Sequence, residues 1–327
     1  MLLTRREAIA VAGGGLALLT EMPARAEAAY PSQTIKLIVP YPAGGTTDFI
    51  GRLIADQFQT GLPGTVIVEN RPGAGTSLGA DQVARAAPDG YTLLLATSST
   101  LAINKTLYKQ LPYDPVKDFT PIGLVAGVPF ALIVNPALPV KTLVEFIAYA
   151  KSKPGLSYGS AGNGSPQHLG AEMLMAATGV DIRHVPYRSS VRAMLDVIAG
   201  HIPFMVVDLQ PALPEIRDGK LRVLGVTTPK RVVGAPDIPT LAEAGLSGFD
   251  LVAWQGVVGP AGLPRPIVDQ LAAQIGKLLD DVKTRDKLTA MTLEPLPGST
   301  PDSFAAYVKT EVDRWAGVVK KSGAQPE

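Results

Sequence analysis

Two glycine-rich loops contain the residues best suited to bind an anion. The first reads Val39-Pro40-Tyr41-Pro42-Ala43-Gly44-Gly45-Thr46-Thr47-Asp48 and joins an apolar run, 35–39, to an amphipathic run, 48–59. A glycine pair at a helix start leaves backbone N–H groups uncovered, and the helix dipole adds partial positive charge there. This loop is therefore predicted to hold a carboxylate. Asp48 also fits a structural role, because an acidic side chain in the first turn complements the dipole.

The second loop has the same character and lies far along the chain from the first. It reads Tyr158-Gly159-Ser160-Ala161-Gly162-Asn163-Gly164-Ser165-Pro166-Gln167-His168 and again separates a strand-like run from a helix-like run. Serine hydroxyls donate hydrogen bonds, and the glycines expose backbone amides. Ser165 fits a helix cap as well as a ligand contact. Two such loops indicate two halves of a protein that close on one ligand.

Enzymatic interpretations fit these residues poorly. Ser165 and His168 resemble a nucleophile and base, but a nucleophile elbow reads G-x-S-x-G, and here Pro166 follows the serine. The stretch 73–79 approaches a dinucleotide fingerprint, but 70–72 separate it from the preceding strand and no acidic residue ends the next strand. The chain has no Cys and three His, and no His, Asp and Glu residues have metal-ligand spacing. We expect no catalytic residues, metal or cofactor.

A third polar stretch lies at the end of another buried strand. Thr97-Ser98-Ser99-Thr100 follows the apolar run 92–96, and ligands of α/β proteins bind at such strand ends. Hydroxyl groups there fit either a ligand contact or a simple strand end. Asn104, a few residues further on, fits either role too.

These loops are connected by alternating apolar and amphipathic runs. The runs predicted as strands are 35–39, 65–69, 92–96, 122–125, 131–134, 156–158, 182–185, 204–207 and 221–226. The runs predicted as helices are 48–59, 78–86, 143–151, 167–178, 192–199, 211–217, 267–279 and 302–319. Most of the strands are continuously apolar, as parallel strands covered on both faces are. The alternation predicts an α/β fold with mostly parallel sheets.

The length of the chain exceeds one typical core, which predicts two domains. The segments 121–139 and 250–264 are rich in apolar and turn residues. We interpret them as the points where the chain crosses into a second domain and returns, which makes the first domain discontinuous.

The N-terminus has the pattern of an export signal over residues 1–26. Arg5 and Arg6 precede a short apolar run, 8–19, and Ala24-Arg25-Ala26 has the form of a cleavage site. The arginine pair resembles a twin-arginine signal, and an ordinary secretory signal is the alternative. Since no cysteine is present to carry a lipid, we expect a free protein in the periplasm. Without the leader, basic and acidic residues balance, which argues against a nucleic-acid partner.

Taken in order, the motifs resemble the substrate-binding proteins of tripartite tricarboxylate transporters, the Bug-type receptors. The resemblance covers nearly the whole mature chain. Besides the two glycine-rich loops, it is carried by Glu69-Asn70-Arg71-Pro72-Gly73-Ala74-Gly75, Pro88-Asp89-Gly90-Tyr91-Thr92-Leu93, Leu107-Tyr108, Asp118-Phe119, Pro239-Thr240-Leu241-Ala242-Glu243-Ala244-Gly245 and Pro260-Ala261-Gly262-Leu263-Pro264.

The resemblance implies a type II periplasmic binding protein fold, with two lobes that close on a small carboxylate. Lobe 1 would comprise 27–128 and 252–327, and lobe 2 would comprise 129–251. In the family both glycine-rich loops hold one carboxylate, and Tyr41 would pack on the carbon skeleton of the ligand. The ligand-binding residues carried over are Tyr41, Ala43, Gly44, Gly45, Thr46, Asp48, Ser98, Ser99, Asn104, Ser160, Ala161, Gly162, Ser165, His168, Tyr187, Arg192 and Asp208. Asp208 would accept a hydrogen bond from a ligand hydroxyl or amine.

One stretch departs from the family pattern. Where relatives often have Gly and Pro-Ala after the tyrosine, this chain reads Tyr187-Arg188-Ser189-Ser190-Val191-Arg192. Arg188 and Arg192 would share a helix face if the stretch is helical. We hypothesise that one of them pairs with the distal carboxylate of the ligand. The alternative is a basic pair that faces solvent.

The sequence thus predicts a monomeric periplasmic receptor that is not an enzyme. It would deliver a small organic acid to a membrane permease with a large and a small subunit. Two alternatives stay open, namely a receptor that signals to a membrane sensor kinase and an α/β hydrolase.

Overall fold

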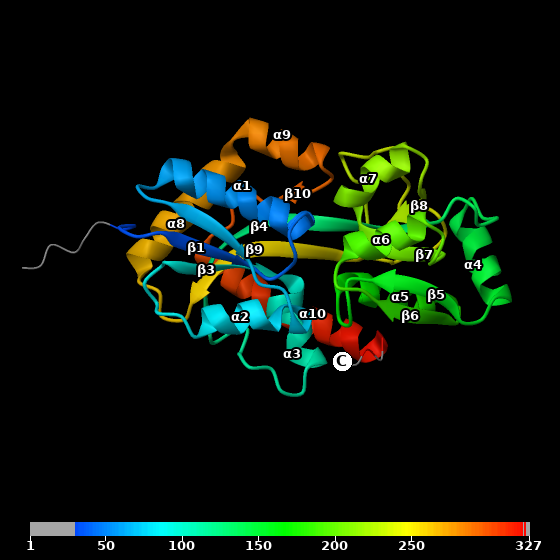
Figure 1. Cartoon of the computed structure of the whole chain (residues 1–327), viewed down its shortest axis with the longest axis horizontal. Coiled ribbons are helices and arrows are strands. Elements are labelled where there is room, and N and C mark those ends of the chain that lie inside the picture. The colour runs from blue at the N-terminus through cyan, green and yellow to red at the C-terminus, as the bar shows by residue number, and fades with distance from the viewer. Residues whose placement is uncertain (1–29, 323, 325–327) are drawn as a thin grey trace, which may run out of the picture.

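The computed structural model describes residues 30–322 and 324, so the predicted export signal lies outside the described residues. The described part of the chain forms two lobes that lie side by side, with two long strands running between them (Figure 1). No helix within these residues is long and apolar enough to cross a membrane. The predicted α/β fold of two lobes is confirmed.

Strands from both lobes join into one path of paired strands. In chain order they are β1 (Ile35–Val39), β2 (Val66–Asn70), β3 (Thr92–Thr97), β4 (Phe119–Val134), β5 (Leu156–Ser160), β6 (Ile182–Pro186), β7 (Phe204–Asp208), β8 (Arg222–Val226), β9 (Val252–Pro260) and β10 (Glu294–Pro295). Their order is β2-β1-β3-β9-β4-β7-β5-β6, and β8 and β10 each pair with β4. The strands β1, β2 and β3 are parallel in one lobe, and β5, β6 and β7 are parallel in the other.

The two long strands, β4 and β9, run antiparallel through the middle of the molecule. The N-terminal part of β4 pairs with β9 as far as Pro129, and from Phe130 onward β4 pairs with β7 and β8 instead. The separate strands predicted at 122–125 and 131–134 are therefore one strand of 16 residues. Pro129, which has no N–H to donate, stands where β4 changes partners. The lobe boundaries at 128/129 and 251/252 stay a prediction.

Helices cover the sheet on both faces (Figure 1). They are α1 (Thr46–Gly61), α2 (Ser77–Ala84), α3 (Asn104–Leu107), α4 (Leu143–Ser152), α5 (Pro166–Thr178), α6 (Ser190–Ile198), α7 (Leu209–Arg217), α8 (Arg265–Asp280), α9 (Val282–Ala290) and α10 (Pro301–Ser322). A 3₁₀ turn, η1 (Ala74–Thr76), precedes α2, and a π-helical turn, η2 (Ser99–Ile103), precedes α3.

The position of α1 follows from its apolar stripe. Ile50, Ile54 and Phe58 recur at helical spacing and are completely buried, while Arg52 and Gln59 on the other face are exposed. Burying a side chain of this size contributes about 2 kcal/mol. The stripe fixes α1 against β1 and β2, so the first turn of the helix stands at the C-terminal end of β1.

The last helix, α10, contacts both lobes, since it packs against η2, α3 and β4 and also against α5. One buried carboxylate, Glu311, ties α10 to β9. Its Oε2 accepts hydrogen bonds from the indole N–H of Trp254, at 2.7 Å, and from that of Trp315, at 2.9 Å. The orientation of Trp254, which reaches the space between the lobes, is thereby fixed.

Candidate functional site

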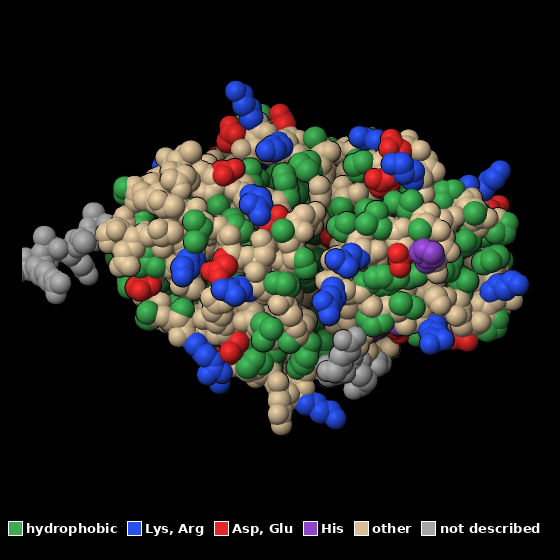
Figure 2. Space-filling view, in the orientation of Figure 1, with side chains coloured by type: hydrophobic (Ala, Val, Ile, Leu, Met, Phe, Trp, Pro, Cys, Tyr) green, Lys and Arg blue, Asp and Glu red, His purple; other side chains and the backbone are tan. Residues whose placement is uncertain are grey.

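A cavity of about 340 Å³ lies between the lobes, and we call it the first cavity. One side of it is formed by the loop 41–47, the end of β3 and part of β9. The other side is formed by the starts of α5 and α6 and by the end of β7. In Figure 2 the lobes meet along a seam, and basic side chains gather beside it on the smaller lobe.

A second cavity, of about 480 Å³, adjoins the first. The two share Tyr41, Pro42, Ser99 and Ala161 as lining residues. Tyr41 and Ser99 are connected, because the tyrosine hydroxyl donates a hydrogen bond to Ser99 Oγ at 3.2 Å. Burial raises the pKa of Tyr41, and the bond to Ser99 offsets part of this rise. Tyr41 therefore stays a neutral hydroxyl in the wall between the two cavities.

Three helix N-termini converge on the first cavity. It is lined by the first turns of α1, α5 and α6, and Arg192 of α6 lines it too. The starts of α5 and α6 are capped by Ser165 and Ser189, but the N-cap of α1 is Gly45, which has no side chain to cap it. The backbone N–H groups of α1 thus face the cavity region without a side-chain acceptor from their N-cap. Helix dipoles and one guanidinium together favour an anion here.

The turn before α1 is shaped by Asp48. Its carboxylate accepts hydrogen bonds from the Gly44 N–H and the Asn70 side chain, each at 3.0 Å, and forms a bidentate pair with Arg52. Burial raises the pKa of Asp48, but these hydrogen bonds outweigh burial and hold it below its usual value. Gly44 has a φ of +87°, which favours glycine. Asp48 does not line either cavity, and it acts by fixing the shape of the loop.

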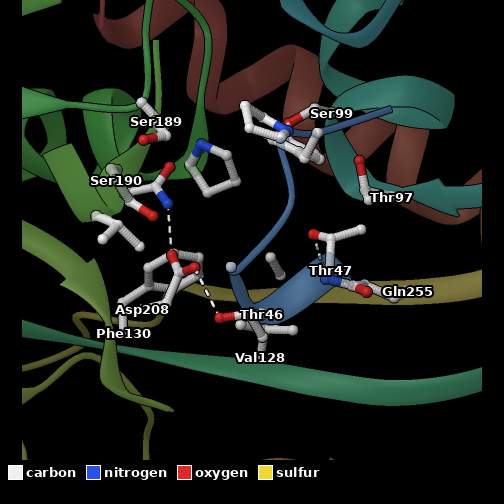
Figure 3. Close-up of a pocket in the computed structure, with 18 of the residues that line it drawn as sticks. Thr46, Thr47, Thr97, Ser99, Val128, Phe130, Ser189, Ser190, Asp208 and Gln255 are labelled. Carbon is white, nitrogen blue, oxygen red and sulfur yellow. Dashed lines mark hydrogen bonds between the residues drawn. The ribbon is translucent and has the colours of Figure 1, made fainter. Parts of the chain in front are cut away.

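Asp208 connects the lobes across the first cavity. It ends β7 and is 8% exposed. Thr46 Oγ1, from the opposite lobe, donates a hydrogen bond to its Oδ2 at 2.9 Å, and Gln167 Nε2 donates to its Oδ1 (Figure 3). Burial raises the pKa of Asp208, while the hydrogen bonds from Thr46 and Gln167 act in the opposite direction. Asp208 therefore accepts hydrogen bonds from the starts of both α1 and α5.

The other predicted site residues divide between the cavities and the interior. Residues that line the first cavity are Tyr41, Ala43, Gly44, Gly45, Thr46, Ser98, Ser99, Ala161, Arg192 and Asp208. Gly162, Ser165 and Tyr187 line the second cavity, as does Arg188. Asn104 lines neither, because its amide donates to Gly75 O at 2.8 Å in a buried cluster beneath Tyr113. Ser160 and His168, which belong to the second loop, line neither cavity either.

A stacked pair of histidine rings supports that second loop. His168 and His184 stack with ring centroids 4.0 Å apart. His168 Nδ1 accepts the Gly164 N–H at 3.0 Å, and His184 Nε2 is 2.6 Å from Ser160 Oγ. Burial, and then the charge of His168, lower the pKa of His184 to about 4. His184 therefore forms a cluster with His168 and Ser160.

The arrangement around Ser165 is that of a helix cap. Ser165 Oγ accepts the His168 N–H at 3.3 Å and donates to Gly162 O at 2.7 Å.

Among the described residues, no group of three or more His, Asp or Glu side chains is placed to hold a metal ion.

The two arginines after Tyr187 do not share a helix face. The helix α6 begins at Ser190, so Arg188 precedes it and Arg192 lies in its first turn. They line different cavities. The condition for a shared face, that the whole stretch is helical, is not met, because Ser189 caps the helix and its Oγ accepts the Arg192 N–H at 3.3 Å.

Several lining residues were not foreseen from the sequence. They are Thr47, Val128, Phe130, Gln167, Ser189, Ser190, Trp254 and Gln255. Trp254-Gln255-Gly256 was predicted only as part of the crossing at 250–264, and this segment contains β9. The sequence did contain one indication of Gln255, because it is a polar residue within an otherwise apolar strand. The Gln255 side chain donates from Nε2 to Thr47 Oγ1 at 2.9 Å (Figure 3).

Comparisons with known proteins show which family and fold the chain resembles. Residues 50–324 match the family described as tripartite tricarboxylate transporter family receptor. Protein BugT of Bordetella pertussis is 36% identical over 298 residues, which cover 90% of this chain and 91% of BugT. The solved structure of Rpa4515 from R. palustris with adipate has a TM-score of 0.88 and 35% identity, covering 91% of this chain and 100% of Rpa4515. MatC from Rhodopseudomonas palustris with bound malate has a TM-score of 0.83 and 34% identity, covering 89% and 100%.

Proposed function

Because this chain belongs to the family of tripartite tricarboxylate transporter receptors, we propose that it is a receptor that captures a small organic carboxylate between its lobes. The observation that carries the proposal is the convergence of three helix N-termini and Arg192 on one cavity between the lobes. Helix N-termini bind carboxylates through backbone N–H groups. Two structural relatives hold adipate and malate, which are both organic acids.

In this proposal the carboxylate occupies the start of α1. Gly45 and Thr46 supply backbone N–H groups, and the second glycine-rich loop closes over the ligand from the other lobe. Tyr41 packs against the carbon skeleton, since it lines both cavities. Ser98 and Ser99 offer hydroxyl groups from the end of β3.

The receptor would work in the periplasm and present its ligand to a membrane permease with a large and a small subunit. Closure around the ligand would create the surface that the permease recognises, because a ligand shifts the protein toward the form that binds it better. We expect a monomer that binds its ligand without changing it chemically.

Calorimetric titration of the refolded protein with organic acids tests the proposal. Unfolding and refolding remove any ligand carried through purification. We expect saturable binding of at least one class of carboxylates, with the acid recovered unchanged. Binding at 100 times the dissociation constant should also stabilise the protein by about 2.7 kcal/mol. If no organic acid binds, or if the acid is consumed, the proposed function is wrong.

A variant of Arg192 tests whether this residue binds the distal carboxylate of the ligand. Arg192→Gln removes the charge that lines the first cavity, and Arg183→Gln, on the exposed face of β6, is the matched control. Losing a charge-assisted hydrogen bond of this kind costs about 1.5–3 kcal/mol. We expect dicarboxylates to bind at least about tenfold more weakly to Arg192→Gln, while the control binds as the wild type does. Equal affinities in all three proteins would exclude a role for Arg192.

A further inference from the structure

Buried polar atoms without partners gather around the first cavity. Among the described residues these atoms are Ser98 Oγ, Gln167 Oε1, Gln255 Oε1 and Thr292 Oγ1. The first three belong to residues that line the first cavity, and each of these residues is more than nine-tenths buried. Native proteins keep few buried polar atoms unpaired because each one is costly. Their concentration at one cavity indicates that the ligand supplies the missing partners.

The chemistry of the missing partners follows from the two glutamines. An amide oxygen only accepts hydrogen bonds, and so does an ionised carboxylate. Gln167 must therefore direct its NH₂ group toward Asp208, which leaves its Oε1 as the unpaired atom. Gln255 directs its NH₂ group toward Thr47 and likewise leaves its Oε1 unpaired. Both unpaired oxygens need a donor.

A plain dicarboxylate does not supply such a donor. Its oxygens accept hydrogen bonds, so against Gln167 Oε1 and Asp208 it would meet only other acceptors. A hydroxyl group donates one hydrogen bond and fits this side of the cavity. An ammonium group donates as well, and Asp208 would attract it, but three helix N-termini and Arg192 line the same cavity and oppose a cation.

We propose that the ligand is a hydroxy-substituted carboxylic acid whose hydroxyl group donates to Gln167 Oε1, beside Asp208. This inference rests on the proposed function, which places the carboxylate at the start of α1. Thr46 belongs to the first turn of α1 and donates to Asp208 at 2.9 Å. The proposed carboxylate position is therefore next to the acceptors Gln167 and Asp208. It follows that the hydroxyl group is carried by a carbon close to the carboxylate.

Titration with matched pairs of acids tests this inference. The pairs are propionate with each enantiomer of lactate, succinate with each enantiomer of malate, and glutarate with each enantiomer of 2-hydroxyglutarate. Alanine and aspartate carry an ammonium group at the same carbon. We expect at least one hydroxy acid to bind about tenfold or more tightly than its parent acid and its amino analogue.

A substitution that removes the amide oxygen of Gln167 tests whether this residue causes the preference for hydroxy acids. Gln167→Met keeps the length of the side chain and should bring the affinity ratio of the hydroxy acid to its parent acid close to one. Gln82→Met, on the exposed face of α2, is the same change outside the cleft and should keep the wild-type ratio. A circular dichroism spectrum of each variant checks that it is folded.

The outcomes separate the two proposals. If parent acids bind as tightly as their hydroxy analogues, or if the ratio is unchanged in Gln167→Met, this inference is wrong and the proposed function stands. If the amino analogues bind more tightly than the hydroxy acids, the choice of a hydroxyl donor is wrong. If none of the acids binds, the proposed function fails and this inference fails with it.

Discussion

Replacing Gly164 by alanine is expected to weaken ligand binding by obstructing contact between the lobes. Gly164 lies in the second glycine-rich loop, and a Cβ atom there would stand 2.0 Å from Leu107 Cδ2 of α3, on the opposite lobe, against 3.4–4 Å for ordinary contact. Leu107 is 4% exposed, so it has little room to move aside. The clash exists only when the lobes are together.

Two separate free-energy costs determine the size of the effect of Gly164→Ala. Gly164 has a φ of +70°, and an alanine held there costs about 1–2 kcal/mol in the open and closed forms alike. Overpacking against Leu107 costs about 1–3 kcal/mol in the closed form only. The first cost lowers the free energy of unfolding, whereas the second lowers affinity by about 5- to 150-fold.

A double-mutant cycle isolates the contact between the lobes. Leu107→Ala makes room for the added methyl group, so Gly164→Ala should cost little affinity in that background. Gly179→Ala is the matched control for the backbone, because Gly179 has a φ of +69° and a Cβ added there would meet no atom within 4 Å. It should lower stability without changing affinity. Affinities come from calorimetric titration, and stabilities come from urea denaturation.

Two results would refute this reasoning. If Gly164→Ala binds ligand as the wild type does while it loses stability, the bound form does not bring Gly164 against Leu107. If Leu107→Ala fails to restore affinity, the loss arises within the loop itself.

Three further perturbations test other parts of the structure. The pKa of His184 is lowered from 6.5 to about 4 by burial and the charge of His168, so its contribution to stability is complete above pH 6.5 and is lost as the pH falls toward 4. Allowing for its partial exposure, urea denaturation should show a loss of about 2 kcal/mol over this window, and the slope should flatten in His184→Phe. Glu311→Gln should lower the free energy of unfolding by about 1–3 kcal/mol, because the carboxylate accepts from two buried indoles; a change near zero would mean that packing alone holds α10. Thr46→Val removes a donor to Asp208 between the lobes, so small-angle X-ray scattering should show a larger radius of gyration without ligand, and an unchanged radius would show that this bond does not hold the lobes together.

The sequence predicted the family and the fold class because both depend on local patterns. A strand such as β3 is continuously apolar from Leu93 to Ala96, since helices cover both faces of the sheet. The length of β4 was not predictable in this way. Pro129 interrupts hydrogen bonding locally, and only the positions of β7, β8 and β9 show that the strand continues past it.

The lining of the cleft was harder to foresee than the loops that flank it. The glycine-rich loops have a local signal, whereas Gln167 and Gln255 are single polar residues in elements that meet only in the folded chain. Asp48 and Asn104 were selected for their polarity beside a loop, but they turn inward to bond Gly44 and Gly75. The direction of a side chain beside a loop depends on which backbone groups need hydrogen-bond partners. The sequence alone does not show which backbone groups these are.

The single strand β4 also bears on how the molecule unfolds. It supplies hydrogen bonds to the sheets of both lobes, and α10 contacts both lobes as well. Neither lobe can lose its structure without exposing backbone groups and apolar surface of the other. We therefore expect denaturation to be one cooperative transition, reported alike by every spectroscopic probe. Chimeras that exchange a lobe with a relative would have to transfer β4, β9 and α10 as one piece.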